Sequence, residues 1–160
     1  MIEAENLRKT FGQTECLKGI TFSVGEGNVL GFLGPNGAGK TTTIKVLTGL
    51  LRPSHGSARL GGHDVQKEFH RIQPLLGYLP EDAPAYPDMR IQDFLSFIAG
   101  IKKIPAKMQK QVVEAALDEV EMLSHRKRLI SNISKGMRQR VGLAQAILGD
   151  PKIVILDEPT

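Results

Sequence analysis

The sequence predicts an α/β fold that has an antiparallel β part at its N-terminus and a helical subdomain inserted into the core. Residues 29–34 and 153–156 are short apolar runs that predict buried strands, and the second reads as a parallel strand, since strands covered on both faces are apolar without alternation. A glycine-rich segment and then a helical pattern follow the first run. A later stretch with helical spacing of apolar residues is therefore expected to be inserted between parts of an α/β core.

The composition is that of an ordinary globular domain. The chain has 160 residues, 41% of them hydrophobic and 24% charged, so it can bury a core without disulfides. Its single cysteine, Cys16, excludes an internal disulfide and fits a reducing cytosol. No apolar run approaches the ~18 residues of a membrane span, so a membrane role would require a partner. The basic run 125–128 is expected to be solvated, and no nucleic-acid binding is expected.

The first half of the chain predicts strands around turns, followed by a helix. Alternating apolar residues predict a strand at 20–24, and a Gly-Glu-Gly turn comes after it. A helix is expected over about 40–51, after the buried strand at 29–34. Residues 57–65 predict a short hairpin around two adjacent glycines.

The second half is predominantly helical. Four prolines from Pro74 to Pro87 predict a linker rather than an element. Residues 91–104 and 107–123 have helical character, and a further helix is expected over about 134–148. It would stop at Gly149 and lead into the final strand.

Residues Gly34–Thr41, GPNGAGKT, match the pattern G-x-x-x-x-G-K-[ST] at every fixed position. Glycines at 34, 37 and 39 would let the backbone curl so that successive N–H groups face a bound anion. The following helix would add its dipole, Lys40 would neutralise the β- and γ-phosphates, and the Thr41 hydroxyl would ligate Mg²⁺. The alternative is a glycine-rich turn with a surface lysine. The pattern and its context predict a P-loop NTPase.

Two adjacent carboxylates, Asp157 and Glu158, follow the last predicted strand. A P-loop ATPase needs an acidic residue at a neighbouring strand end to hold Mg²⁺ through water, and Asp157 is suited to that role. Glu158 would polarise the attacking water, because neighbouring side chains on a strand diverge. The alternative is a buried strand that merely ends in two solvated acids.

Two further segments resemble motifs of ABC-type ATPases. Residues 132–148, NISKGMRQRVGLAQAIL, resemble the family's signature motif, and residues 150–160, DPKIVILDEPT, resemble its Walker B motif. The resemblance covers essentially the whole chain, because the A-loop aromatic, P-loop, Q-loop, helical subdomain, signature and Walker B follow in the family's order. A GTPase would carry an N-K-x-D guanine clamp, which the sequence lacks. The resemblance implies an ABC ATPase core that binds ATP and Mg²⁺.

The resemblance also implies roles for single residues. Phe11 matches the aromatic residue that stacks on the adenine, although the family usually has tyrosine there; the alternative is a buried strand aromatic. Asp157 matches the metal residue of Walker B, and Glu158 matches the catalytic base. The phosphates and Mg²⁺ would be contacted by Gly34, Pro35, Asn36, Gly37, Ala38, Gly39, Lys40, Thr41 and Thr42.

Two motifs depart from the general family pattern. Glu81 stands where most members have the Q-loop glutamine, and its carboxylate would still reach Mg²⁺. The signature consists of Ser134, Lys135, Gly136 and Met137, with lysine in place of the first glycine and methionine in place of glutamine. Ser134 is suited to cap its helix, whose end would face a phosphate. Both departures resemble the ABC-2-type export branch, which includes gliding-motility and multidrug or sodium export ATPases.

Partners follow from the same resemblance. In this family the signature of one subunit closes on the nucleotide of another, so a head-to-tail dimer with a second ATPase subunit is expected. A separate transmembrane permease would dock around residues 81–87 and the helical subdomain. That partner would hold the protein on the inner, cytoplasmic face of the cell membrane. The alternatives are a soluble ABC ATPase acting on nucleic acid or ribosomes, and a regulatory module that binds nucleotide without hydrolysis.

The family pattern extends beyond Walker B to a D-loop and a histidine that contacts the γ-phosphate. All four histidines of this sequence lie upstream of Walker B. The chain is therefore expected to be the N-terminal part of a longer, ATP-hydrolysing subunit, and normal hydrolysis is not expected of residues 1–160 alone. The predicted division is a β part and P-loop core at 1–86, a helical subdomain at 87–133, and the signature helix with the Walker B strand at 134–160.

Overall fold

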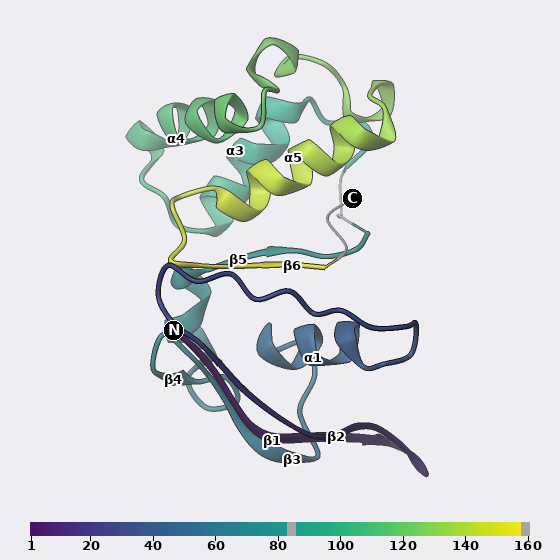
Figure 1. The fold of residues 1–160 in the computed structure, drawn as a ribbon. Helices are drawn as coiled ribbons and strands as arrows, with labels where there is room; N and C mark the ends of the chain where they lie inside the picture. The colour runs from purple at the N-terminus through teal and green to yellow at the C-terminus, as the bar shows by residue number, and fades with distance from the viewer. Residues whose placement is uncertain (83–85, 158–160) are drawn as a thin grey trace. The chain divides into compact units, whose positions relative to one another are not determined.

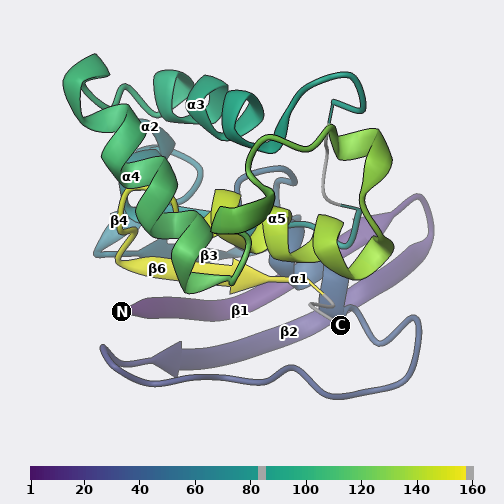
Figure 2. The same cartoon turned by 90° about the horizontal axis from the view of Figure 1, so that it is seen from above.

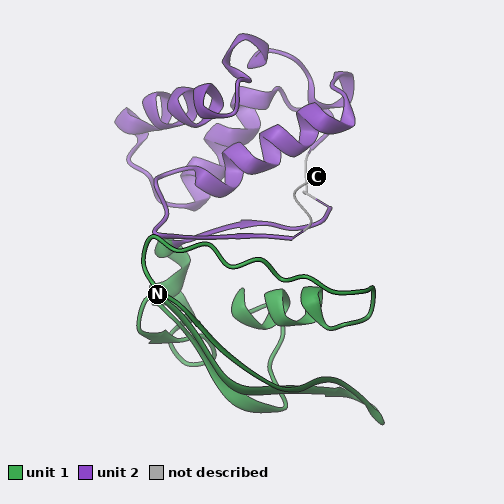
Figure 3. Ribbon diagram, viewed as in Figure 1, with its two compact units in different colours: residues 1–75 green, residues 76–160 purple. Residues whose placement is uncertain are grey.

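The computed structural model describes residues 1–82 and 86–157 of the chain. The chain divides into two compact units, Met1–Leu75 and Leu76–Thr160, which Figure 3 colours separately. Each unit has its own sheet and its own helices. The α/β class and the antiparallel β part at the N-terminus are confirmed.

The first unit is built on an antiparallel sheet with the strand order β2-β1-β3-β4 (Figure 1). Its strands are β1 (Ile2–Phe11), β2 (Thr14–Val24), β3 (His55–Leu60) and β4 (His63–Asp64). Gly61 and Gly62 turn the chain between β3 and β4 with φ values of 58° and 84°. A tight type I′ hairpin needs positive φ at both central positions, so the predicted hairpin is confirmed.

Helix α1 (Lys40–Leu47) buries Thr43, Ile44, Val46 and Leu47. It ends before the predicted boundary at about 51, because Gly49 leaves the helical conformation with φ 71°. A Cβ at Gly49 would lie 2.6 Å from Cε2 of Phe69, which begins the short helix α2 (Phe69–Ile72). A 3₁₀ turn follows at Gln73–Leu75. The helix thus ends at a glycine with positive φ, and the nearby Phe69 ring leaves no room for a side chain at position 49.

The prediction of a buried strand at 29–34 is wrong. Residues 28–35 have no regular secondary structure, and the side chains of Val29 and Leu33 are 98% and 97% exposed. Phe32 is covered in part, since its ring packs edge-on against Phe22 of β2 with centroids 5.2 Å apart. An apolar run becomes a strand only where a neighbour pairs with its N–H and C=O groups. Neither sheet of the described residues pairs with this run.

A pair of parallel strands forms the sheet of the second unit: β5 (Leu76–Leu79) and β6 (Ile153–Leu156). The parallel strand predicted at 153–156 is confirmed, but it is covered on one face only. Ile153 and Ile155 are buried, whereas Val154 is 42% exposed. The prediction of a linker from Pro74 to Pro87 is wrong for residues 76–79, which form β5. A four-residue strand flanked by prolines is too short for a strand pattern to be recognised in the sequence.

The helices of the second unit pack against one another, and α5 packs against β5 (Figures 1 and 2). They are α3 (Ile91–Ile101), α4 (Ala106–Glu119) and α5 (Lys135–Ile147), with 3₁₀ turns at Leu123–His125 and Ile130–Asn132. Phe94, Leu117 and Leu148 are among the core residues that they share. Gly77 of β5 lies so close to α5 that an added Cβ would overlap the carbonyl oxygen of Ala146. In the described residues, no helix is both long and apolar enough to cross a membrane.

A partly buried lysine joins the end of α3 to the end of α5. The Nζ of Lys102 donates hydrogen bonds to the carbonyl oxygens of Leu148 at 2.8 Å and Gln145 at 3.5 Å. A cation is favourable at this C-terminal end of a helix. Burial nevertheless lowers the pKa of the Lys102 ammonium group from its ordinary value of 10.5.

We expect the free energy of unfolding to rise with pH between the lowered pKa of Lys102 and 10.5. In that window the unfolded chain holds the proton and the folded chain does not, so raising the pH favours the folded state. Lys102→Met should remove this part of the rise, measured as the melting temperature at a series of pH values from about 8 upward. Lys103→Met, at the neighbouring exposed lysine, is the matched control. The same pH slope in both variants would contradict the prediction.

Candidate active site

The glycine-rich loop before α1 has the backbone geometry that its sequence predicts. Gly37 and Gly39 have φ values of 81° and 91°, a region that favours glycine. Gly39 is also tightly enclosed, because a Cβ there would lie 2.6 Å from Cδ2 of Leu17 and 3.0 Å from the carbonyl oxygen of Cys16. The end of the loop thus packs closely against β2, and a residue with a side chain at position 39 would clash with that strand.

The N-terminus of α1 has donors and positive charge but no acid of its own. The helix begins at Lys40 without a side-chain cap and without an acidic residue in its first turn. The Nζ of Lys40 folds back over the loop and donates to the carbonyl oxygens of Gly34 at 2.7 Å and Pro35 at 3.1 Å. Free backbone N–H groups, a helix dipole and an ammonium group all favour an anion here. This arrangement fits the phosphates of a nucleotide.

Phe11 ends β1 at the turn of the β1–β2 hairpin, and its side chain is 48% exposed. This exposure removes the alternative of a buried strand aromatic. The hairpin packs against the glycine-rich loop, since Leu17 and Cys16 of β2 are the residues that enclose Gly39. The partly exposed Phe11 ring and the glycine-rich loop therefore belong to one packed unit.

Two of the predicted carboxylates lie in the second unit. Asp157 follows β6, is 3% exposed, and its backbone N–H donates to the carbonyl oxygen of Leu79 at 2.9 Å. Burial, and then the charge of Asp157, raises the pKa of Tyr78 above 10.0. Glu81 follows β5 and is exposed. Because β5 and β6 are parallel neighbours, both acids follow strand ends at the same edge of the sheet. Glu158 lies outside the described residues.

The predicted signature residues form the N-terminus of α5. Ser134 is the N-cap, and its Oγ accepts a hydrogen bond from the backbone N–H of Met137 at 3.2 Å, so the predicted cap is confirmed. Ser134, Lys135 and Gly136 are exposed. The side chain of Met137 instead packs against the helical core, which a glutamine would do less favourably. Methionine at this position is therefore explained by packing.

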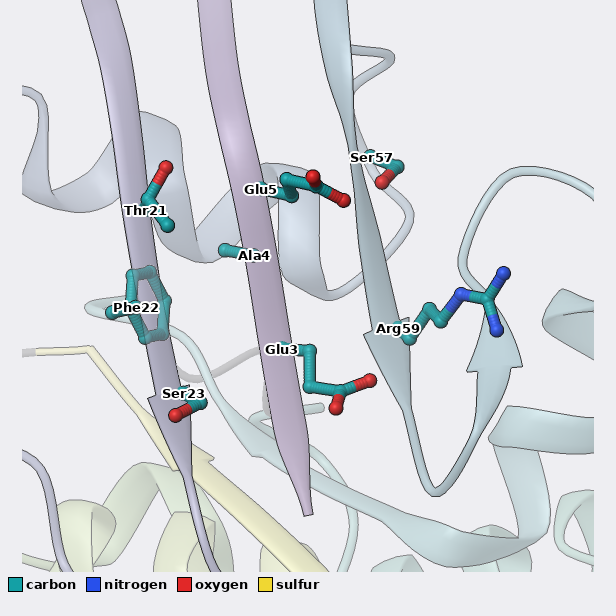
Figure 4. Close-up of a pocket in the computed structure, with 8 residues that line it drawn as sticks. All are labelled: Glu3, Ala4, Glu5, Thr21, Phe22, Ser23, Ser57 and Arg59. Atoms are coloured by element: carbon teal, nitrogen blue, oxygen red, sulfur yellow. The ribbon is translucent and has the colours of Figure 1, made fainter.

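A hollow of about 470 Å³ on the sheet of the first unit was not predicted. Figure 4 shows Glu3 and Glu5 of β1 between residues of β2 and β3; the other lining residues are Ala4, Thr21, Phe22, Ser23, Ser57 and Arg59. Strand register brings them together, since Glu3 lies opposite Ser23 on β2 and Arg59 on β3. None of the predicted site residues lines this hollow. A second hollow, of about 340 Å³, has a mainly polar lining that includes Gln92, Lys110 and Glu114.

Comparison with known proteins agrees with the resemblance of the motifs. The sequence model of the family described as ABC transporter matches residues 17–160. The uncharacterized ABC transporter ATP-binding protein YhcH of Bacillus subtilis is 38% identical over the whole chain, and the linearmycin resistance ATP-binding protein LnrL of that organism is 33% identical. ABC transporter A family member 1 of Dictyostelium discoideum is 38% identical over 91% of the chain and 16% of its own length. The chain spans about half the length of the two bacterial relatives, 52% and 51%.

Solved structures agree in fold. The structure of an ATP-binding subunit of an ABC transporter matches with a TM-score of 0.88 and 27% identity, over 99% of this chain and 66% of that one. The ATP-binding cassette MJ0796, solved as a dimer in a post-hydrolysis state with ADP and Pi, matches with a TM-score of 0.89 over 100% of this chain and 75% of that one. At 21% identity the second match concerns the fold alone. Because the family match spans nearly the whole chain and the fold agrees with it, this chain belongs to the ATP-binding domains of the ABC transporter family.

Proposed function

We propose that the protein to which this chain belongs binds and hydrolyses ATP to drive an ABC-type membrane transporter, and that the transporter is an exporter. The observation that carries this proposal is the loop before α1, where an uncapped helix end and the ammonium group of Lys40 converge on one anion-binding turn. The departures at Glu81 and Lys135 support the export branch. So does the relative LnrL, which is named as a linearmycin resistance protein.

Each predicted residue has a role in this proposal. The exposed ring of Phe11 stacks on the adenine, and residues 34–42 contact the phosphates. Thr41, Asp157 and Glu81 would hold Mg²⁺, which would supply positive charge to stabilise the charge that develops on the transferred phosphoryl group. Glu158 accepts a proton from the attacking water. In this scheme the residues of the chain bind the substrate, orient it and remove one proton.

The site is completed by a second copy or a homologous subunit. Ser134, Lys135 and Gly136 are exposed at the start of α5, so they are available to the nucleotide of a partner in a head-to-tail dimer. A transmembrane permease docks on the segment around 81–87 and on the helical subdomain at 87–133. In the sequence this subdomain follows the P-loop core at 1–86 and precedes the final segment at 134–160. The protein is then held at the cytoplasmic face of the membrane through the permease.

A substitution at Gly136 tests this arrangement. In the protein to which this chain belongs, Gly136→Asp is expected to abolish the ATP-dependent dimer while leaving Mg-ATP binding by the monomer unchanged. An added Cβ meets no atom within 4 Å, and an acid in the first turn of a helix is favourable, so the fold should tolerate the change. The new carboxylate would repel the partner's γ-phosphate. Sedimentation velocity with and without Mg-ATP measures the dimer, and calorimetry measures the binding.

Gly100→Asp is the matched control, since Gly100 of α3 is equally open to an added Cβ. It should leave both the dimer and the binding unchanged. An unchanged ATP-dependent dimer in Gly136→Asp would contradict a role of the signature in trans.

A further inference from the structure

A lysine lies over the face of the ring that is proposed to stack on adenine. Lys9 and Phe11 both belong to β1, and the Nζ of Lys9 lies over the Phe11 ring, 4.9 Å from its centroid. The same Nζ donates a hydrogen bond of 2.8 Å to the carbonyl oxygen of Arg52. The ammonium group is therefore held in place between the ring and the chain that follows α1.

This contact leaves part of the ring available to a ligand. Phe11 is 48% exposed although Lys9 covers one of its faces, so the open area belongs to the remaining face and edges. Lys9 is also connected to the phosphate-binding loop. It lies opposite Leu17 in the β1–β2 register, and Leu17 encloses Gly39 at the end of that loop. The cation, the ring and the loop thus occupy fixed places in the first unit.

We propose that Lys9 is a positioning residue for nucleotide binding: it holds the Phe11 ring and strengthens the stacking of that ring on the adenine. The inference rests on the proposed function, because it assigns the open ring face to the base. Phenylalanine lacks the hydroxyl with which a tyrosine could anchor itself, so its orientation depends on packing and on the cation. A ring that is already oriented loses less entropy when the base binds. A cation on one face also draws π-electron density toward itself, which reduces repulsion between the opposite face and the π system of a purine.

Two other roles for Lys9 lead to different results. A lysine that bound the phosphates directly would affect every polyphosphate, with or without a base. A lysine that only supported the fold through Arg52 would lower stability and weaken all ligands together. Action through the ring affects only ligands that carry a base, and only while the ring is present.

The test is calorimetric titration of the protein to which this chain belongs. The two probes are Mg-ATP and Mg-tripolyphosphate, and only the first carries a base. Lys9→Met should raise the Kd of Mg-ATP about two- to five-fold, the range of an exposed cation–π contact, and leave the Kd of tripolyphosphate unchanged. Lys9→Arg, which keeps a cation at this position, should bind Mg-ATP with the affinity of the wild type. In a Phe11→Leu background, Lys9→Met should have no further effect on Mg-ATP. Lys18→Met, at an exposed lysine of β2, is the matched control and should change neither Kd.

Three outcomes would overturn the inference. They are an unchanged Mg-ATP affinity in Lys9→Met, an equal loss for both probes, or an undiminished effect of Lys9→Met when Phe11 is leucine. These results leave the proposed function intact, because they concern only the residue behind the ring. Failure of the wild-type protein to bind either probe would instead overturn the proposed function and this inference together.

Discussion

Replacing Lys40 with alanine is expected to weaken the binding of Mg-ATP to the protein to which this chain belongs by about 10- to 100-fold. The ammonium group lies over the loop, 2.7 Å from the carbonyl oxygen of Gly34 and 3.1 Å from that of Pro35. On nucleotide binding it would exchange these neutral acceptors for phosphate oxygens, which form stronger, charge-assisted hydrogen bonds. Alanine removes the cation and leaves only the backbone N–H groups. Calorimetric titration with Mg-ATP measures the loss.

Lys45→Ala is the control for this substitution. Lys45 lies in the last turn of the same helix and is exposed, so its loss removes an equal charge away from the loop. Its effect on Mg-ATP binding should be small. Undiminished binding in Lys40→Ala would refute the assignment of this loop to phosphate, and the proposed function would fail with it.

Glu158→Gln should preserve Mg-ATP binding and lower the rate of ATP hydrolysis by about 10²- to 10⁴-fold, the usual contribution of a general base. The residue follows Asp157, whose buried position and backbone bond to Leu79 fix the end of β6. Glutamine keeps the size of the side chain and its capacity to orient a water, but it cannot accept the proton. Phosphate release from the protein to which this chain belongs, measured beside calorimetric binding, separates the two effects.

Glu119→Gln, at an exposed acid of α4, is the control and should leave hydrolysis unchanged. A turnover rate in Glu158→Gln equal to that of the wild type would exclude Glu158 as the base. Lost Mg-ATP binding in this variant would also contradict its assigned role, because a residue that only receives a proton is not needed to hold the nucleotide.

Features with local physical causes could be predicted from the sequence. The hairpin at Gly61 and Gly62 follows from the positive φ that its turn requires. The cap at Ser134 is local, because its hydroxyl accepts from a backbone N–H of the first helical turn that has no partner within the helix. The core positions of α4 follow from the helical spacing of its apolar residues. The backbone of the glycine-rich loop has a cause of the same kind, since Gly37 and Gly39 adopt the positive φ that glycine allows.

Features that depend on a distant partner could not be predicted. Residues 29–34 have the composition of a buried strand, yet no described strand pairs with them, so Val29 and Leu33 are exposed. The opposite error concerns β5, which is short and flanked by prolines but becomes a strand by pairing with β6. In both segments the outcome depends on whether a neighbour satisfies the backbone hydrogen bonds, and that neighbour lies far away in the sequence.

The site shows the same division. By itself, the sequence determined which chemical groups are present, because the glycines, Lys40, Thr41 and the carboxylates are recognised by type and spacing. Only the tertiary structure decided that Phe11 is half exposed, that Met137 is packed inside, and that Lys9 covers one face of the Phe11 ring. The physical reason is that exposure and side-chain contact depend on strand register and on packing between elements, which bring together residues that no local pattern relates.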